Sequence, residues 1–298
     1  MPVIGFFNSG IPATQTNNLV EFRKGLKDAG FTEGENVAIE FHWAENQFDR
    51  LPALAADVIA RRPAVIVSNT LAALRAKAAT ATIPIVFTTG SDPVRDGLVA
   101  SLSRPGGNVT GVVFITGDLG AKRLELLRLL VPKATTIAVL IYPNTSETEA
   151  ERRDVQAAAE KTGHQLLVLD VKSASDIEAA IATAAARGVG ALLGGTGPFL
   201  FNNRTLIVEL AARHAIPAMY SNRDYCLAGG LLSYGASLPD AYRQAGVYVA
   251  RILKGEKPTN LPVIQSSKIE FVINLKTAKA LGLEFHPQLL ATADEVIE

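Results

Sequence analysis

The sequence is short of cysteine and has no excess of either charge, and each shortage excludes a class of protein. The single cysteine, Cys226, cannot form an internal disulfide or build a cysteine-rich zinc or iron–sulfur site. Lys and Arg number 29 and Asp and Glu number 29, so the formal net charge is zero. A protein that binds nucleic acid through bulk charge needs a basic excess to neutralise phosphates. We therefore expect no nucleic-acid partner.

Signals for membrane spans and for catalysis are also missing. No apolar run reaches the roughly 18 residues that a transmembrane helix needs. The four histidines show no metal-ligand spacing such as H-x-x-x-H, and the chain has neither a Walker A motif nor a G-x-S-x-G elbow. The sequence predicts no catalytic residue, no metal and no cofactor, which favours a binding protein over an enzyme.

Short apolar runs alternate with helical patterns about ten residues long. An expected strand at 3–7 and helix at 18–29 open a first series, which includes a helix at 94–103, and a second series begins near residue 119. Such alternation is typical of βαβ units and of parallel sheets covered on both faces. A chain of 298 residues that is 48% hydrophobic can bury two cores. The pattern predicts an α/β fold of two doubly wound lobes, which fits better than a TIM barrel, and the extended stretch 257–271 suits a connection between them.

Polar residues follow most of the predicted strands, in the loops 8–10, 68–70, 88–93, 142–147, 194–197 and 221–224. In open α/β sheets ligands bind outside the carboxyl ends of the strands. Hydroxyls, amides and helix N-terminal N–H groups suit a small polar ligand or one that carries a carboxylate. The same residue types are preferred helix N-caps, so each has two interpretations. Asp92, for example, can cap a following helix or accept a hydrogen bond from a ligand ammonium.

Seven motifs occur in a fixed order along the chain: DRLPALAA (49–56), IPIVF (83–87), SDPV (91–94), RPGGNVTG (104–111), KRLELL (122–127), GGLLSYG (229–235) and INLKTA (273–278). In this order they resemble the ABC-transporter substrate-binding proteins of the type that includes binders of tryptophan and other aromatic amino acids. The resemblance covers nearly the whole chain. Its motifs are more specific for the family than for the ligand.

The resemblance implies a type I periplasmic-binding-protein fold, with a central ligand cleft and three crossing segments between the lobes. Lobe one is expected at 1–115 plus 235–258, and lobe two at 116–234 plus 262–298. The family also implies export through a signal peptide or lipoprotein leader, which the printed sequence does not show. We therefore expect a periplasmic or lipid-anchored extracytoplasmic location.

The same resemblance implies the function and the site. The protein would capture a small ligand, an amino acid (aromatic favoured) or a small aromatic acid, for an ABC permease in the membrane, and the cleft would close on binding. A monomer is expected. Asp92 or Glu147 would accept from the ligand ammonium, and Tyr142 or Phe114 would pack on its side chain. The expected ligand-binding residues are Asn8, Ser9, Asn69, Thr70, Thr89, Ser91 and Asp92 in lobe one, and Tyr142, Asn144, Ser146, Glu147, Thr196 and Ser221 in lobe two.

Two other functions stay open on the sequence. The first is an enzyme on two doubly wound lobes that acts on a small polar or phosphorylated metabolite, which would need a placed acid–base pair or a metal. The second is a sensory ligand-binding domain, which would carry a helix-turn-helix or a membrane span beside it. Turnover on a substrate panel would separate the enzyme from the binding protein.

Overall fold

Residue contacts divide the chain into two compact units. The computed structural model describes residues 1–114, 119–143 and 146–298. Unit 1 comprises Met1–Phe114 and Leu238–Ser267, and unit 2 comprises Ile115–Ser237 and Lys268–Glu298. The chain therefore passes between the units three times, as the predicted fold class requires. The boundaries of the units differ from the expected lobes at 235–237, which belong to unit 2, and at 262–267, which belong to unit 1.

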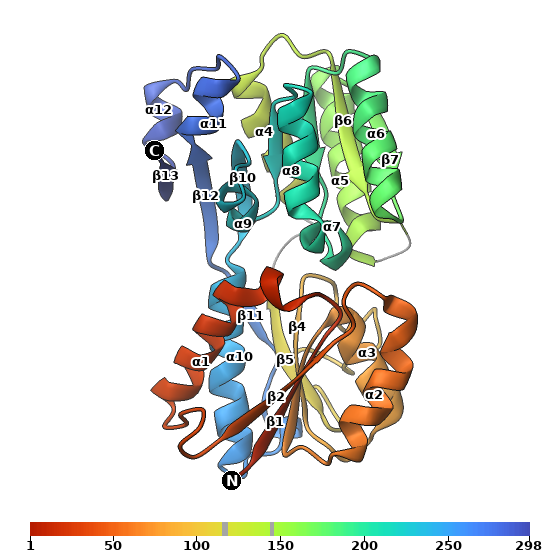
Figure 1. Ribbon diagram of the computed structural model, residues 1–298, viewed down its shortest axis with the longest axis vertical. Coiled ribbons are helices and arrows are strands. Elements are labelled where there is room, and N and C mark those ends of the chain that lie inside the picture. Colours follow the sequence, from red (N-terminus) through yellow and green to blue (C-terminus); the bar gives the residue numbers. More distant parts are fainter. Residues whose placement is uncertain (115–118, 144–145) are drawn as a thin grey trace. The chain divides into compact units, whose positions relative to one another are not determined.

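Unit 1 is built on a six-stranded sheet in the order β11-β5-β4-β3-β1-β2 (Figure 1). All its strand pairs are parallel. The strands are β1 (Val3–Asn8), β2 (Ala38–Trp43), β3 (Val65–Asn69), β4 (Ile85–Thr89), β5 (Val109–Phe114) and β11 (Ile264–Ser266). The helices are α1 (Thr16–Asp28), α2 (Leu51–Ala60), α3 (Thr70–Ala79) and α10 (Leu238–Leu253), with 3-10 turns at Pro12–Gln15, Phe48–Arg50 and Pro258–Asn260.

Alternate residues of these strands pack against different helices. Phe6 belongs to the buried cluster that includes α1 and α10, and Phe7 belongs to the cluster that includes α2 and α3. Helix α10 is far from α1 in sequence, yet a Cβ on Gly25 would overlap the carbonyl oxygen of Arg243, and a Cβ on Gly246 would overlap that of Phe22. Glycines on both helices therefore let the two backbones approach closely. This packing places residues after 237 back in unit 1.

Unit 2 is built on a seven-stranded sheet in the order β13-β12-β10-β9-β8-β6-β7. Its strands are parallel except for the antiparallel pair β10 and β12. The strands are β6 (Thr136–Ile141), β7 (Gln165–Asp170), β8 (Ala191–Gly194), β9 (Ala218–Tyr220), β10 (Leu232–Ala236), β12 (Ile269–Asn274) and β13 (Glu295–Ile297). The helices are α4 (Gly120–Leu130), α5 (Ser146–Thr162), α6 (Ala174–Ala186), α7 (Pro198–Asn202), α8 (Arg204–Arg213), α9 (Arg223–Leu227), α11 (Leu275–Ala280) and α12 (Pro287–Leu290).

The prediction of a helix at 94–103 is wrong, because turns occupy this stretch. Gly97 adopts a φ of +75°, a left-handed conformation that ends any helix begun at Pro93. The carbonyl oxygen of Pro93 instead accepts from the N–H groups of Leu98 and Val99 at 2.7 and 3.1 Å, which closes a compact turn. The stretch expected to be extended, 257–271, contains β11 and the start of β12, and the chain leaves unit 1 between these strands.

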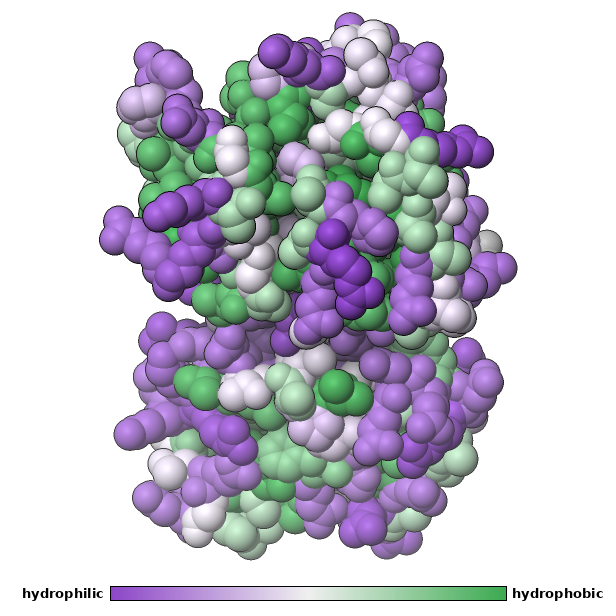
Figure 2. Space-filling model, turned by 45° about the horizontal axis from the view of Figure 1, so that its top comes forward, coloured by the Kyte–Doolittle hydropathy of each residue, from purple (hydrophilic) through white to green (hydrophobic). Residues whose placement is uncertain are grey.

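Within the described residues, no helix has the length and apolar composition needed to cross a membrane. On the face that Figure 2 shows, hydrophilic and apolar residues are interspersed over each unit. Single exposed apolar residues are normal on a folded surface.

Candidate functional site

The two sheets share one strand order, and that order marks a candidate site in each unit. Unit 1 has the order β2-β1-β3-β4-β5 and unit 2 has the order β7-β6-β8-β9-β10. The connections that leave the two central strands lead to opposite sides of the sheet, which creates a topological switch between β1 and β3 and between β6 and β8. Open parallel sheets of this order bind ligands at the carboxyl ends of the strands at that switch.

In unit 1 the switch carries three hydrogen-bonded polar side chains. Asn69 Nδ2 donates to Ser9 Oγ at 2.7 Å, and the backbone N–H of Ser9 donates to Asn69 Oδ1 at 3.2 Å. Asn8 Oδ1 accepts from the N–H of Gly10 at 2.8 Å. Asn8 and Ser9 are fully buried. The two bonds between Ser9 and Asn69 join the ends of β1 and β3 and fix the orientation of the Asn69 amide. The bond from Gly10 fixes the orientation of the Asn8 amide.

The Asn8 amide also reaches α10. Its Nδ2 lies 3.4 Å from the hydroxyl of Tyr242, to which it donates. Burial raises the pKa of Tyr242, an effect only partly opposed by hydrogen bonds to Thr88 and Asn8, so the phenol is neutral at physiological pH. Tyr242 was not predicted as a site residue, because it lies 234 residues after Asn8 and no sequence pattern signals its contact with the first strand.

A row of hydroxyls follows β3 and β4. Thr70 Oγ1 lies 2.9 Å from Thr89 Oγ1, which lies 2.8 Å from Ser91 Oγ and accepts from the Ser91 N–H at 3.1 Å. All three residues are buried. Hydroxyls both donate and accept, so the row can reorient its protons toward an anionic group. The structure thus brings Thr70, Thr89 and Ser91 together, next to Asn69, which Thr70 follows in the chain.

Asp92 has a capping role in the structure. It is exposed, and its Oδ1 accepts from the backbone N–H groups of Val94 and Arg95 at 2.9 and 3.1 Å. These bonds stabilise the turn at 93–97 that replaces the expected helix. A contact between Asp92 and a ligand ammonium stays a prediction.

In unit 2 the switch carries a pair of aromatic rings. Tyr142 follows β6 and stacks on Phe199 of α7, with ring centroids 4.8 Å apart and planes inclined by 29°. Phe199 is reached by a sharp turn after β8, where Gly197 has a φ of +106° and Pro198 is the first residue of α7. Phe199 was not predicted as a site residue. Gly197-Pro198 signals the start of a helix just before it, and this signal could have located the residue.

A buried acidic side chain, Glu147 in the first turn of α5, lies close to the turn that leads into Phe199. Glu147 is 7% exposed, and one of its carboxylate oxygens lies 4.0 Å from the position of a Cβ on Gly197. A buried carboxylate beside two aromatic rings can bind a cation attached to a flat apolar group. Asn144 lies outside the described residues, and Ser146 is described only as the first residue of α5.

Thr196 follows β8, and its hydrogen bonds go to a residue that the sequence analysis missed. Its N–H and its Oγ1 donate to Glu151 Oε2 at 2.7 and 2.8 Å. Glu151 in turn pairs with Arg123, and both side chains are fully buried. Ser221, 7% exposed, follows β9, the next strand in the sheet. The ends of three adjacent strands thus place Tyr142, Thr196 and Ser221 along one edge.

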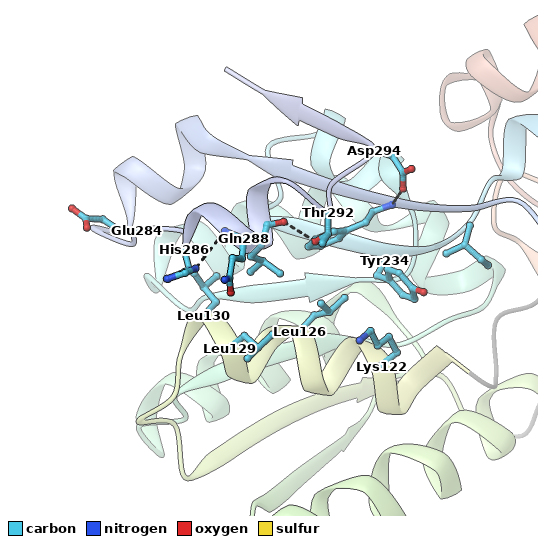
Figure 3. Close-up of a pocket in the computed structure, with 13 residues that line it drawn as sticks. Lys122, Leu126, Leu129, Leu130, Tyr234, Glu284, His286, Gln288, Thr292 and Asp294 are labelled. Atoms are coloured by element: carbon cyan, nitrogen blue, oxygen red, sulfur yellow. Dashed lines mark hydrogen bonds between the residues drawn. The ribbon is translucent and has the colours of Figure 1, made fainter.

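Unit 2 has a separate cavity of about 810 Å³ that contains none of the predicted site residues. Figure 3 shows Leu126, Leu129 and Leu130 of α4 directed toward the segment 284–294 across this cavity. Its walls are largely apolar, and its charged residues, among them Lys122 and Asp294, are of both signs. Among the described residues, no three His, Cys, Asp or Glu side chains gather in a way that could hold a metal ion.

Comparison with known proteins gives consistent matches over nearly the full length. The family described as ABC transporter substrate binding protein matches residues 15–297. A tyrosine-binding protein from Clostridioides difficile is 30% identical over 267 residues, which cover 88% of this chain and 76% of the relative.

Two solved structures are similar to this chain. The ABC domain from Streptococcus pneumonia in complex with L-Trp is 25% identical with a TM-score of 0.89 and covers 99% of each chain. The ligand-free, open structure of a substrate binding protein with adhesive properties from Clostridium difficile is 25% identical with a TM-score of 0.71, over 100% of this chain and 99% of that one.

Proposed function

Because the chain belongs to the family of ABC transporter substrate-binding proteins, we propose that it captures an amino acid with an aromatic side chain for an ABC importer. Its two doubly wound sheets give it the fold of type I periplasmic binding proteins. One relative is named for tyrosine and one similar structure holds L-Trp, which supports the aromatic class.

The observation that carries this proposal is the stack of Tyr142 on Phe199 beside the buried carboxylate of Glu147. In this proposal the ligand ring packs against the two aromatic rings, and its ammonium donates to Glu147. Such aromatic contacts contribute about 0.5–1.5 kcal/mol beyond the apolar area that they bury. The carboxylate of the ligand accepts from the hydroxyl row of Thr70, Thr89 and Ser91 in unit 1.

We further propose that the ligand binds between the two units and that binding favours a closed form. A ligand that contacts both units has more contacts in a closed form than in an open one, and this difference shifts the equilibrium. We also propose that the ligand contacts the other residues predicted for the site: Asn8, Ser9, Asn69, Asp92, Asn144, Ser146, Thr196 and Ser221.

The location, partner and chemistry follow from the same proposal. The protein works outside the cytoplasm and delivers its ligand to an ABC permease as a monomer. It releases the ligand unchanged, because binding and closure need no reaction. Mass spectrometry of the ligand recovered after prolonged incubation tests this point, and a chemically altered product would favour an enzyme.

Calorimetry on refolded protein, freed of any retained ligand, tests the ligand class. We expect L-tyrosine, L-tryptophan or L-phenylalanine to bind more tightly than L-leucine. Replacing Tyr142 by leucine should weaken aromatic binding about tenfold, since tenfold corresponds to about 1.4 kcal/mol. Tyr234→Leu, a change at the separate cavity of unit 2, is the matched control and should leave affinity unchanged. Equal binding of leucine and tyrosine would overturn the aromatic class.

The role of Glu147 is tested with an analogue that lacks the ammonium, 3-(4-hydroxyphenyl)propionate. Glu147→Gln should weaken binding of L-tyrosine by a factor of ten or more, as expected for loss of a buried charge-assisted bond, about 1.5–3 kcal/mol. The same variant should bind the analogue as well as the wild type does. If both ligands weaken equally, Glu147 does not recognise the ammonium.

A further inference from the structure

A fully buried ion pair lies beneath the candidate site in unit 2. Arg123 of α4 donates through Nη2 to Glu151 Oε1 of α5, and both side chains are 0% exposed. A buried pair adds little net stability over apolar residues of the same size, because both charges lose their hydration. Its presence therefore calls for a role other than holding two helices together.

The second oxygen of the Glu151 carboxylate is bonded to the loop between β8 and α7. Glu151 Oε2 accepts from both the N–H and the hydroxyl of Thr196. One carboxylate thus accepts from an arginine on one side and from a loop on the other. Charge-assisted hydrogen bonds of this kind are short and directional, so they fix the loop relative to α4 and α5.

The loop itself has little freedom to form in another way. A Cβ on Gly195 would overlap the carbonyl oxygen of Leu140 and would lie 3.2 Å from Glu151 Oε2. Gly197, with its positive φ, then turns the chain into α7. Two residues after this turn begins, Phe199 stacks on Tyr142. Thr196 thus lies three residues before Phe199, with Gly197 and Pro198 between them.

We propose that Glu151 is a positioning residue for ligand binding. Arg123 orients its carboxylate, the carboxylate holds Thr196, and the loop in turn holds Phe199 against Tyr142. Thr196 accordingly acts through its bonds to Glu151, in addition to the ligand contact proposed for it above. This inference rests on the proposed function only for its effect on affinity, since the restraint on the loop exists without ligand.

Hydrogen exchange on the ligand-free chain tests the restraint directly. Glu151→Gln should speed exchange of the Thr196 amide about tenfold or more, because its acceptor is no longer held by the ion pair. Asp154→Ala is the matched control. Asp154 lies on the same helix as Glu151 and accepts from the Ala121 N–H of α4 at 2.7 Å. Among the described residues it has no hydrogen bond to the loop that carries Thr196. Unchanged exchange at Thr196 in Glu151→Gln would overturn the proposal.

L-Tyrosine affinity gives the second readout, measured well below the unfolding midpoint of every variant. We expect Glu151→Gln and Thr196→Val to weaken binding about tenfold, Thr196→Ser to retain it, and Asp154→Ala to retain it despite a lowered midpoint. If Glu151→Gln does not fold, the comparison of Thr196→Val with Thr196→Ser still tests the restraint. Equal affinity for Val and Ser at 196 would overturn it.

The two proposals fail separately. A wild type that binds no aromatic amino acid contradicts the proposed function, and the exchange experiment still decides the restraint. A wild type that binds tyrosine, with variants that lose affinity in step with stability, contradicts the positioning role alone.

Discussion

Removing both charges of the buried Arg123–Glu151 pair should cost less stability than removing either charge alone. Additive effects would give the opposite order. Arg123→Met removes the arginine from the buried Glu151 carboxylate, which keeps its two hydrogen bonds from Thr196. Loss of one partner of a buried ion pair costs about 3–5 kcal/mol. Glu151→Met removes the carboxylate that pairs with the buried Arg123 and also removes the acceptor of the Thr196 N–H, so it should cost at least as much.

The double variant carries neither buried charge. The N–H and the hydroxyl of Thr196 still lose their acceptor in this variant. Each unsatisfied buried group lowers the stability by about 1–3 kcal/mol. Methionine is close in length to both replaced side chains and packs well in irregular spaces. We therefore expect the double variant to be more stable than either single variant.

Urea unfolding measures this order. Far-UV circular dichroism follows both units, whereas fluorescence of Trp43, the single tryptophan, follows β2 of unit 1. The losses should appear in the circular-dichroism transition and leave the Trp43 transition nearly unchanged. A double variant less stable than both single variants would refute the reasoning, because it would mean that the pair contributes net stability.

Three further predictions concern other parts of the chain. Gly25→Ala should destabilise unit 1 by about 1–3 kcal/mol, because its Cβ would overlap the Arg243 carbonyl; Trp43 fluorescence in urea checks this, and Lys24→Ala on the same helix should cost far less. Burial raises the pKa of the Cys226 thiol to about 12, so a thiol reagent at pH 8 should label the chain only after unfolding, and rapid labelling of folded protein would contradict this. Burial lowers the pKa of His42 below its ordinary 6.5, so between these two pKa values unfolding takes up a proton. The free energy of unfolding should therefore fall as the pH drops through 6.5 toward the pKa of His42 in the folded protein. His42→Gln should flatten that slope, and a slope equal to that of the wild type would assign it to other groups.

Long regular elements were predictable because their periodicity is local. The alternation of strands and helices gave the two series, and both sheets have the doubly wound order that it implies. The predicted helix at 94–103 was wrong although the apolar residues Leu98 and Val99 fit a helical spacing. The left-handed conformation of Gly97 prevents a helix from forming there. The helices α7, α9 and α12 have only four or five residues, too few for a periodic signal.

The candidate site was predictable as a set of loops but not as a set of contacts. The rule that ligands bind at strand ends selected Ser9, Asn69 and Thr89, and the structure joins the first two by reciprocal hydrogen bonds. It did not select Arg123 or Glu151, because both lie inside helices where charged residues usually face solvent. The positioning role of Glu151, with Arg123 orienting its carboxylate, is a proposal.

The alternation of strands and helices, the doubly wound order and the family were predictable from the sequence, because they depend on local pattern and on ordered motifs. The pairing of polar groups was not predictable, because it depends on how distant segments pack. Arg123 and Glu151 are 28 residues apart, Glu151 and Thr196 are 45 apart, and Asn8 and Tyr242 are 234 apart. A hydrogen bond needs its atoms within about 3 Å and aligned. No spacing along the chain fixes such a distance until helices and strands have packed.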